Sequence, residues 1–342
     1  MSGKITWSEL LSQPEAWRRV LARCDDGQGL PDVSLDHFDE VVVLGSGTSY
    51  YLALAAADWI RRRHPMIVRA VPACEVMLDT FEARPKRGRR RLVIAFSRSG
   101  ESTECLLAVK ALRLSGAQVL AVSCTADSSL LKLGDQTLCV SEGHEQGLVM
   151  LRSFTSMLIA VQHLFGPEED RRALQALPDA GRAWLDTGVE GLRHLANLRD
   201  FDRFVFLASD SSYPIALEAS LKIQEMSIST SEAYHSLEYR HGPRATADNR
   251  TLVTLFALSD PGHGAALARD LKALGVVLLV VGKGAERYEG VADLVVPVDV
   301  GVEADCAGPL NLLPLQVMAF ETAMRLGRDP DAPVNLSKVV TF

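Results

Sequence analysis

The sequence lacks the features that would assign it to a membrane, secreted or disordered class of protein. No apolar run approaches the roughly 18 residues that a membrane-spanning helix needs. Residues 1–20 mix acidic, basic and apolar side chains, which predicts an amphipathic helix and not a signal peptide. Aromatic residues make up 6% of the chain and charged residues 23%, while 47% of the 342 residues are hydrophobic. This composition is typical of a soluble α/β protein with a sizeable core.

Paired cysteines are absent as well. The six cysteines include no Cys-x-x-Cys pair, and no histidine lies near one at the spacing of a metal site. Several cysteines lie in apolar runs, where a free thiol packs as a small hydrophobic side chain. This usage predicts free thiols and a cytoplasmic location, where the environment is reducing.

An excess of positive charge is also missing. The net charge of −7 argues against bulk nucleic-acid binding, so we expect any anion-binding group to be local. The one basic cluster, residues 84–91, lies between a helix-like stretch and an apolar run and is expected to be a solvated loop.

The most informative stretch is a loop of small hydroxyl side chains, Ser97-Arg98-Ser99-Gly100-Glu101-Ser102. It follows an apolar run over 92–96, predicted to be a buried strand, and precedes a helical pattern over 103–114. The first turn of a helix offers free backbone N–H groups and the positive end of the helix dipole, which attract anions. The loop therefore predicts a phosphate site, although an ordinary strand–helix turn can have a similar composition.

Two halves of the chain resemble each other. Residues 41–44 precede a Gly-Ser-Gly-Thr-Ser-Tyr loop, and 203–207 precede an Ala-Ser-Asp-Ser-Ser-Tyr loop, with Leu44 and Leu207 163 positions apart. The strand ending at Ser97 matches one ending at Ser259, 162 positions later. Each half is predicted as strand, hydroxyl loop, helix, strand, strand, helix, strand, strand. This order predicts two three-layer α/β/α units with parallel sheets, which bind ligands beyond the carboxyl ends of their strands.

The repeat suggests four segments. We expect a helical N-terminal segment at 1–39, the two α/β halves at 40–198 and 199–327, and a tail at 328–342. Long helices are predicted at 148–165 and 167–198. Because the loop after Ser259 has diverged to Asp-Pro-Gly-His, a phosphate site is expected in the first half.

Candidate catalytic side chains lie in the second half. Lys222 and Glu225 are three residues apart and share one helical face, and His241 follows in a His-Gly-Pro turn. An aldose–ketose shift needs a base to move a proton between C1 and C2 and a second group to open the sugar ring. The same spacing also suits an exposed helical ion pair and an ordinary turn histidine, so spacing alone leaves both interpretations open.

Several motifs in one order resemble the double SIS (sugar isomerase) domain family over about residues 40–342. Its patterns include the isomerase half of glucosamine-6-phosphate synthase and stand-alone aminosugar-phosphate deaminase/isomerases. The matching motifs are Gly47-Thr48-Ser49, the hydroxyl loop 97–102, Tyr213-Pro-Ile-Ala-Leu-Glu with Lys222 and Glu225, Glu232-Ala-Tyr, His241-Gly-Pro and the Asn335-Leu-Ser-Lys-Val-Val-Thr ending.

This resemblance implies a role for each matching residue. Glu225 would be the base that moves the C1/C2 proton, and His241 would assist ring opening across the interface of a homodimer with shared active sites. Lys222 would lie near the C2 substituent, and Lys338 would bring the tail over the sugar. The residues implied in holding a hexose 6-phosphate are Thr48, Ser49, Ser97, Ser99 and Ser102, with Arg98 and Arg152 as departures from the synthase pattern near the sugar. No metal or organic cofactor is implied.

The resemblance favours one reaction and leaves others open. Only about 40 residues precede the first half and residue 2 is serine, so we expect no amidotransferase domain and no synthesis from glutamine. The prediction is conversion of glucosamine or galactosamine 6-phosphate to the ketose 6-phosphate and ammonia. Plain aldose–ketose isomerisation, fructosamine-6-phosphate deglycation and a non-enzymatic phosphosugar sensor are the alternatives. A dehydrogenase is disfavoured because Tyr50 replaces the third glycine of the dinucleotide fingerprint.

Overall fold

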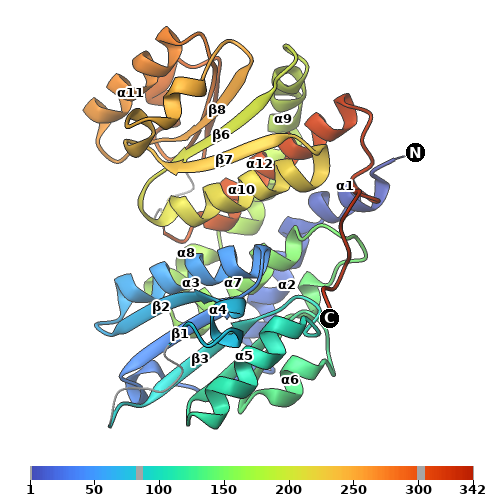
Figure 1. Cartoon of the computed structure of the whole chain (residues 1–342), viewed down its shortest axis with the longest axis vertical. Helices are drawn as coiled ribbons and strands as arrows, with labels where there is room; N and C mark the ends of the chain where they lie inside the picture. Colours follow the sequence, from blue (N-terminus) through green and yellow to red (C-terminus); the bar gives the residue numbers. More distant parts are fainter. Residues whose placement is uncertain (1, 82–87, 299–304, 342) are drawn as a thin grey trace. The chain divides into compact units, whose positions relative to one another are not determined.

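The computed structural model describes residues 2–81, 88–298 and 305–341 (Figure 1). The chain forms two compact units. The first unit comprises Ser12–Pro178 with Ser337–Phe342, and the second comprises Met1–Leu11 with Asp179–Leu336. The predicted N-terminal segment 1–39 is therefore shared between the units, and the tail is shared in the same way. None of the helices in the described residues is both long and apolar enough to cross a lipid bilayer.

The first unit is built on a five-stranded parallel sheet with the order β2-β1-β3-β4-β5. Strands β1 and β3 are buried along their whole length, as expected for apolar runs at the centre of a parallel sheet. The strands are β1 (Glu40–Gly45), β2 (Ile67–Pro72), β3 (Arg91–Phe96), β4 (Gln118–Ser123) and β5 (Gln136–Cys139). The helices are α2 (Gln13–Asp25), α3 (Thr48–Arg63), α4 (Ala73–Met77), α5 (Thr103–Leu114), α6 (Ser129–Leu133), α7 (Arg152–Phe165) and α8 (Glu168–Leu174), with 3₁₀ turns η1 (Leu35–His37) and η2 (Ser141–Gly143).

The second unit repeats this architecture around a parallel sheet with the order β10-β9-β8-β6-β7 (Figure 1). Helices α10 and α12 pack against each other, and α1 contacts α12. The strands are β6 (Arg203–Ala208), β7 (Thr230–His235), β8 (Thr251–Phe256), β9 (Val277–Gly282) and β10 (Leu294–Pro297). The helices are α1 (Lys4–Leu11), α9 (Leu177–Ala196), α10 (Tyr213–Ser227), α11 (Pro261–Ala273) and α12 (Gly308–Arg325), with 3₁₀ turns η3 (Asp210–Ser212), η4 (Glu238–Arg240), η5 (Pro243–Thr246) and η6 (Ala285–Tyr288).

The two sheets confirm the predicted repeat and correct its register. Glu40 lies opposite Arg91 in the first sheet, and Arg203 lies opposite Thr251 in the second. The separation is therefore 163 positions for the first strands but 160 for the next ones, because the β7–β8 connection is three residues shorter than the β2–β3 connection. As a result, Ser259 is the counterpart of Ser99 and not of Ser97. The fold is two tandem α/β/α units, as predicted.

Three local expectations are wrong. The helix predicted over 1–20 is broken between α1 and α2, where Pro14 occupies the first turn of α2. The helix predicted over 167–198 is two helices, α8 and α9, and the one predicted from Leu148 begins at Arg152. In the basic cluster, residues 84–87 lie outside the described residues, whereas Arg91 is buried at the start of β3.

Arg91 is buried because a carboxylate accompanies it. Its Nε donates to Oε1 of Glu40 at 2.7 Å, and both side chains are 1% exposed. Arg69 on β2 lies 3.4 Å from the other Glu40 oxygen. In the second unit the positions of Glu40 and Arg69 are taken by Arg203 and Glu232, which pair at 3.2 Å. The ion pair between the first two strands thus recurs with its charges exchanged.

The buried Glu40–Arg91 pair predicts a large stability effect. The substitution Glu40→Gln removes the carboxylate that pairs with the buried Arg91 guanidinium, which should lower the free energy of unfolding by about 3 kcal/mol. The matched control is Glu15→Gln, which loses only the exposed pairs to Arg18 and Arg19 and should cost less than about 0.5 kcal/mol. Urea unfolding of the two variants measures the difference. Equal midpoints would show that the buried pair does not stabilise the sheet.

Candidate active site

The hydroxyl loop lies where the sequence predicts it, between the end of β3 and the start of α5. The Oγ of Ser97 accepts the N–H of Gly100 at 3.0 Å, and the Oγ of Ser99 accepts the N–H of Glu101 at 3.2 Å. A serine hydroxyl that accepts from the backbone keeps its own proton for donation. Ser102 immediately precedes the first helical residue. The loop therefore presents hydroxyl donors at a helix N-terminus, the arrangement that binds phosphate.

Glycine at position 100 is required by this turn. Its φ of +68° lies in the left-handed region, and a Cβ there would lie 2.3 Å from the Oγ of Ser128. The neighbouring Glu101 carboxylate accepts the N–H of Ser129 at 2.8 Å. That backbone hydrogen bond lowers the pKa of Glu101, so this carboxylate is ionised and held by the start of α6.

The second hydroxyl loop of the first unit follows β1. Gly47 has a φ of +56°, and Thr48 and Ser49, both nearly buried, are the first residues of α3. Strands β1 and β3 are parallel neighbours, so both hydroxyl loops leave the carboxyl edge of the sheet side by side. In open α/β sheets this edge is where ligands bind. The structure thus brings the predicted phosphate residues of the two loops to one edge of one unit.

Arg98 does not extend from the loop as a free cation. Its side chain is 7% exposed, and its guanidinium donates to the carbonyls of Leu148 and Lys338, each at 2.8 Å. Glu145 lies 3.9 Å from the same guanidinium. Arg98 therefore fastens the C-terminal tail to the unit that holds the hydroxyl loop.

Further contacts hold the tail at the same place. The Nζ of Lys338 donates to the carbonyls of Glu145 and Gln146 at 2.9 and 3.0 Å, and the N–H of Thr103 donates to the carbonyl of Val340 at 3.3 Å. The first turn of α5 and the tail are therefore joined directly. Lys338 lies in the same unit as the hydroxyl loop.

Glu145 is a buried carboxylate that no sequence motif indicates. Its carboxylate accepts the N–H of Leu151 at 2.7 Å and both the N–H and the hydroxyl of Ser153. Arg152, predicted near the sugar, donates from Nη1 to the Oγ of Ser12 at 2.8 Å and from its other nitrogens to the carbonyl of His144. Together these bonds fix the start of α7.

The predicted lysine and glutamate lie on α10 of the second unit. Lys222 is fully buried, with its Nζ 3.1 Å from Glu218 and hydrogen-bonded to Glu225. Burial lowers the pKa of Lys222, but the two carboxylates together raise it above the ordinary value of 10.5. Lys222 is therefore an ammonium at neutral pH. An exposed helical ion pair, the alternative interpretation of this spacing, is wrong for Lys222.

Glu218 is the partner that sequence spacing did not single out. It is fully buried one turn before Lys222, so the three residues form a buried carboxylate–ammonium–carboxylate group along one face of the helix. Glu225 is the member with the most exposed side chain, at 17%. This asymmetry leaves Glu225 as the carboxylate that a ligand can reach.

His241 follows η4 in the second unit and is exposed. Its backbone N–H donates to the carbonyl of Glu238 at 2.9 Å, which closes the turn before Gly242-Pro243. The candidate residues thus fall into two groups. The hydroxyl loops and Lys338 belong to the first unit, and Lys222, Glu225 and His241 belong to the second.

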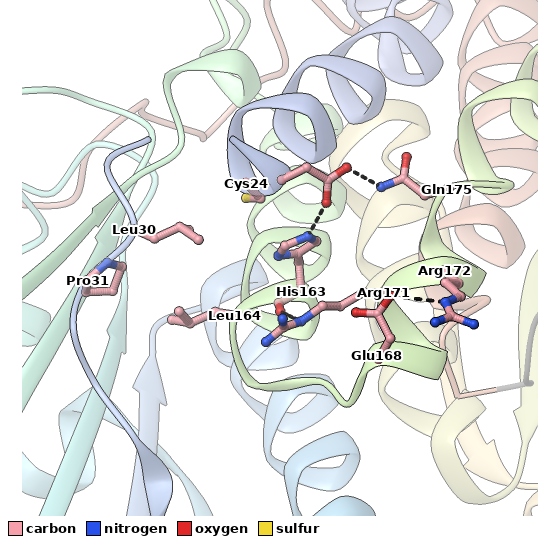
Figure 2. A pocket seen from close by; sticks show the side chains of 10 residues that line it. Cys24, Leu30, Pro31, His163, Leu164, Glu168, Arg171, Arg172 and Gln175 are labelled. Carbon is pink, nitrogen blue, oxygen red and sulfur yellow. Dashed lines mark hydrogen bonds and ion pairs between the residues drawn. The ribbon is translucent and has the colours of Figure 1, made fainter. Parts of the chain in front are cut away.

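A cavity of about 460 Å³ in the first unit contains none of the predicted site residues (Figure 2). In it the Nε2 of His163 lies 2.8 Å from Asp25, and the Nε2 of Gln175 donates to the same carboxylate at 2.8 Å. The Nε of Arg171 donates to the carbonyl of His163 at 3.0 Å. These bonds join α2, α7 and the region of α8, so we assign this group a structural role.

The Arg98 contacts predict that the tail can be released by one substitution. Arg98→Met removes the hydrogen bond to the carbonyl of Lys338, and a bond worth about 1.4 kcal/mol corresponds to about tenfold faster hydrogen exchange of the tail amides. The control is Arg113→Met. Arg113 lies on α5, and its ion pair with Asp135 is more exposed than the contacts of Arg98. Exchange of the β3 amides reports whether the sheet is intact. Unchanged exchange in residues 338–341 would contradict the anchoring role.

Comparisons with known proteins agree with this architecture. The isomerizing glutamine–fructose-6-phosphate aminotransferase of Pyrobaculum aerophilum is 30% identical, over 97% of this chain and 56% of that protein. The chain thus spans about half the length of the curated relatives it matches. The crystal structure of glucosamine-6-phosphate deaminase from Thermotoga maritima is 28% identical with a TM-score of 0.82, and covers 99% of this chain and 100% of that one.

The fold is shared more widely. Tagatose-6-phosphate ketose/aldose isomerase from Escherichia coli superposes with a TM-score of 0.85 at 21% identity, over 97% of this chain and 95% of that one. The family model for the SIS domain matches twice, at residues 35–166 and 197–325, and so covers both sheets. The chain therefore belongs to the SIS domain family.

Proposed function

We propose that the protein is an enzyme that converts an aminohexose 6-phosphate, glucosamine or galactosamine 6-phosphate, to the ketose 6-phosphate and ammonia. The observation that carries this proposal is the buried Glu218–Lys222–Glu225 group in a chain that also has a hydroxyl loop suited to phosphate. The likeness to the deaminase of Thermotoga maritima, over nearly the full length of both chains, supports it.

Phosphate would be held by the hydroxyl loops of the first unit. Ser97, Ser99 and Ser102 supply hydroxyl donors at the start of α5, and Thr48 and Ser49 supply further polar groups from the start of α3. The dipoles of two helices then favour a dianion at the carboxyl edge of the sheet. Arg98 takes part indirectly, because its guanidinium positions the tail.

Glu225 would be the base. In the open-chain aldehyde, its carboxylate takes the proton from C2 and returns it to C1, while the aldehyde oxygen gains a proton and the amine loses one, so that a C1 hydroxyl and a C2 ketimine form. Water then adds to the C2 imine carbon and ammonia leaves, so that the sugar gains the oxygen of one water molecule and loses one nitrogen. The Lys222 ammonium, hydrogen-bonded to Glu225, would orient that carboxylate and lie near the C2 substituent of the sugar.

His241 and Lys338 would complete the site. The exposed position of His241 suits the proposal that it assists ring opening in the neighbouring subunit of a homodimer. Lys338 is brought to the hydroxyl-loop unit by the tail and would close over the sugar. A cytoplasmic location remains a prediction of the cysteine usage.

The substrate class can be tested by a panel of sugar phosphates. Glucosamine or galactosamine 6-phosphate should yield ketose 6-phosphate and ammonia in equal amounts, and unphosphorylated glucosamine should not be used because the hydroxyl loops bind phosphate. The panel also contains hexose 6-phosphates and fructosamine 6-phosphates. Ketose formed without ammonia would favour an isomerase, release of an amino acid would favour a deglycase, and no turnover at all would favour a sensor.

Shared active sites can be tested by complementation. Glu225→Gln should lower kcat by at least about a hundredfold with little change in KM, because the base acts only in the chemical step. His241→Ala should be inactive for a different reason, so mixed dimers of the two variants should regain part of the activity. Each variant mixed with itself is the control. Verified heterodimers without recovered activity would show that His241 does not act across an interface.

A further inference from the structure

The second unit has its own cavity at the carboxyl edge of its sheet. The cavity has a volume of about 220 Å³ and is lined by residues that follow β8 and β9, together with η3 and α12. Among them are Ser212, Ser259, Lys283, Arg287 and Asn311. None of these residues belongs to the proposed catalytic group.

The repeat relates this cavity to the hydroxyl loops of the first unit. The register of the strands equates Ser259 with Ser99, and Ser212 with Ser49. The backbone agrees, because Asp210 has a φ of +62° at the position where Gly47 has +56°. An equivalent backbone hydrogen bond lies at the start of each loop. The N–H of Ser97 donates to the carbonyl of Val122, and the N–H of Ala257 donates to the carbonyl of Val281. The cavity is thus the second unit's equivalent of the proposed phosphate site.

The charge in this cavity comes from side chains. Lys283 and Arg287 are exposed on the segment after β9, and within the described residues neither pairs with a carboxylate. The Arg287 guanidinium lies against Gly284, where a Cβ would approach its Cζ to 3.2 Å. Two cations that line one cavity, with no carboxylate partner among the described residues, favour a doubly charged anion such as a phosphate ester.

The lining also offers a group suited to a hydroxyl. Asn311 on α12 is 6% exposed, and its buried Oδ1 accepts no hydrogen bond from any residue that the structure describes. A buried amide without a partner costs free energy, which a ligand hydroxyl can recover. The amide Oδ1 lies close to Gly282, 3.7 Å from the position that a Cβ would take there.

The loop differs from its first-unit counterpart at the helix start. Asp260 caps α11 by accepting the N–H of His263 at 2.8 Å, and this hydrogen bond lowers the pKa of Asp260. The Asp260 carboxylate thus occupies the helix N-terminus that corresponds to the proposed phosphate position of the first unit. A ligand phosphate in the second unit would instead be held by Lys283 and Arg287.

We propose that this cavity is a second binding site for a small phosphorylated sugar or polyol, separate from the proposed catalytic group. Lys283 and Arg287 hold the phosphate, Asn311 accepts or donates a hydrogen bond to a hydroxyl, and Ser212 and Ser259 border the ligand. The site binds without turnover, because none of the described residues that line it is a carboxylate or histidine that could serve as a base. It therefore suits an effector.

Isothermal titration with glucitol 6-phosphate tests the site, because this open-chain polyol has no carbonyl group and cannot be isomerised. The wild-type chain should bind two molecules. Ser99→Asp, which repels the anion from the first unit, should leave only the site in the second unit. Lys283→Glu with Arg287→Glu should leave only the site in the first unit. The combination of all three substitutions should bind none, and Arg269→Glu, an exposed charge reversal on α11, should behave as the wild type.

The proposal is overturned if the Lys283→Glu, Arg287→Glu chain binds as much glucitol 6-phosphate as the wild type, or if Ser99→Asp alone abolishes all binding. Titration with inorganic phosphate is the second arm. It should bind the second site at least tenfold more weakly than glucitol 6-phosphate, and equal affinity would contradict recognition of a hydroxyl by Asn311. If Ser99→Asp has no effect, the phosphate site of the proposed function fails while the second site stands, so the two failures are distinguishable.

Discussion

Parallel pairing of the strands is the constraint on which the candidate site depends. Because every strand of a sheet runs in the same direction, all of their carboxyl ends meet at one edge, and the loops that leave them become neighbours. In the first unit this places the loops after β1 and β3 together, although about fifty residues separate them in sequence. Strand pairing thereby brings together hydroxyl groups that the chain distributes over distant segments.

The candidate site residues are held by hydrogen bonds of neutral hydroxyl groups in the first unit and by charge pairs in the second. In the hydroxyl loop the serines accept from the backbone, so their protons point away from the turn that they stabilise. On α10 a single ammonium lies between two carboxylates inside the unit. Such a buried group is costly to form, and it persists because each charge has a partner within one helical turn.

Much of this architecture follows from local patterns. The apolar runs at β1, β3 and their counterparts predict parallel strands, and the hydroxyl loops mark their carboxyl ends. Spacing does not reveal burial, however. The sequence therefore predicts that Lys222 and Glu225 share one helical face, but not that Lys222 is buried and also pairs with Glu218. Glu145 escapes prediction for another reason, since it binds backbone N–H groups of a loop whose conformation no motif describes. The direction of Arg98, toward the tail and not toward solvent, likewise depends on tertiary contacts.

The exchanged charges between the first two strands of each sheet have a consequence for folding. A chain with two similar halves risks pairing a strand of one half with a strand of the other while it folds. If β1 paired with β7, Glu40 would meet Glu232, and if β6 paired with β2, Arg203 would meet Arg69. Both mispaired sheets would place like charges together, whereas both native sheets place opposite charges together. The reversed polarity therefore disfavours pairing of a strand with its counterpart's partner in the other half.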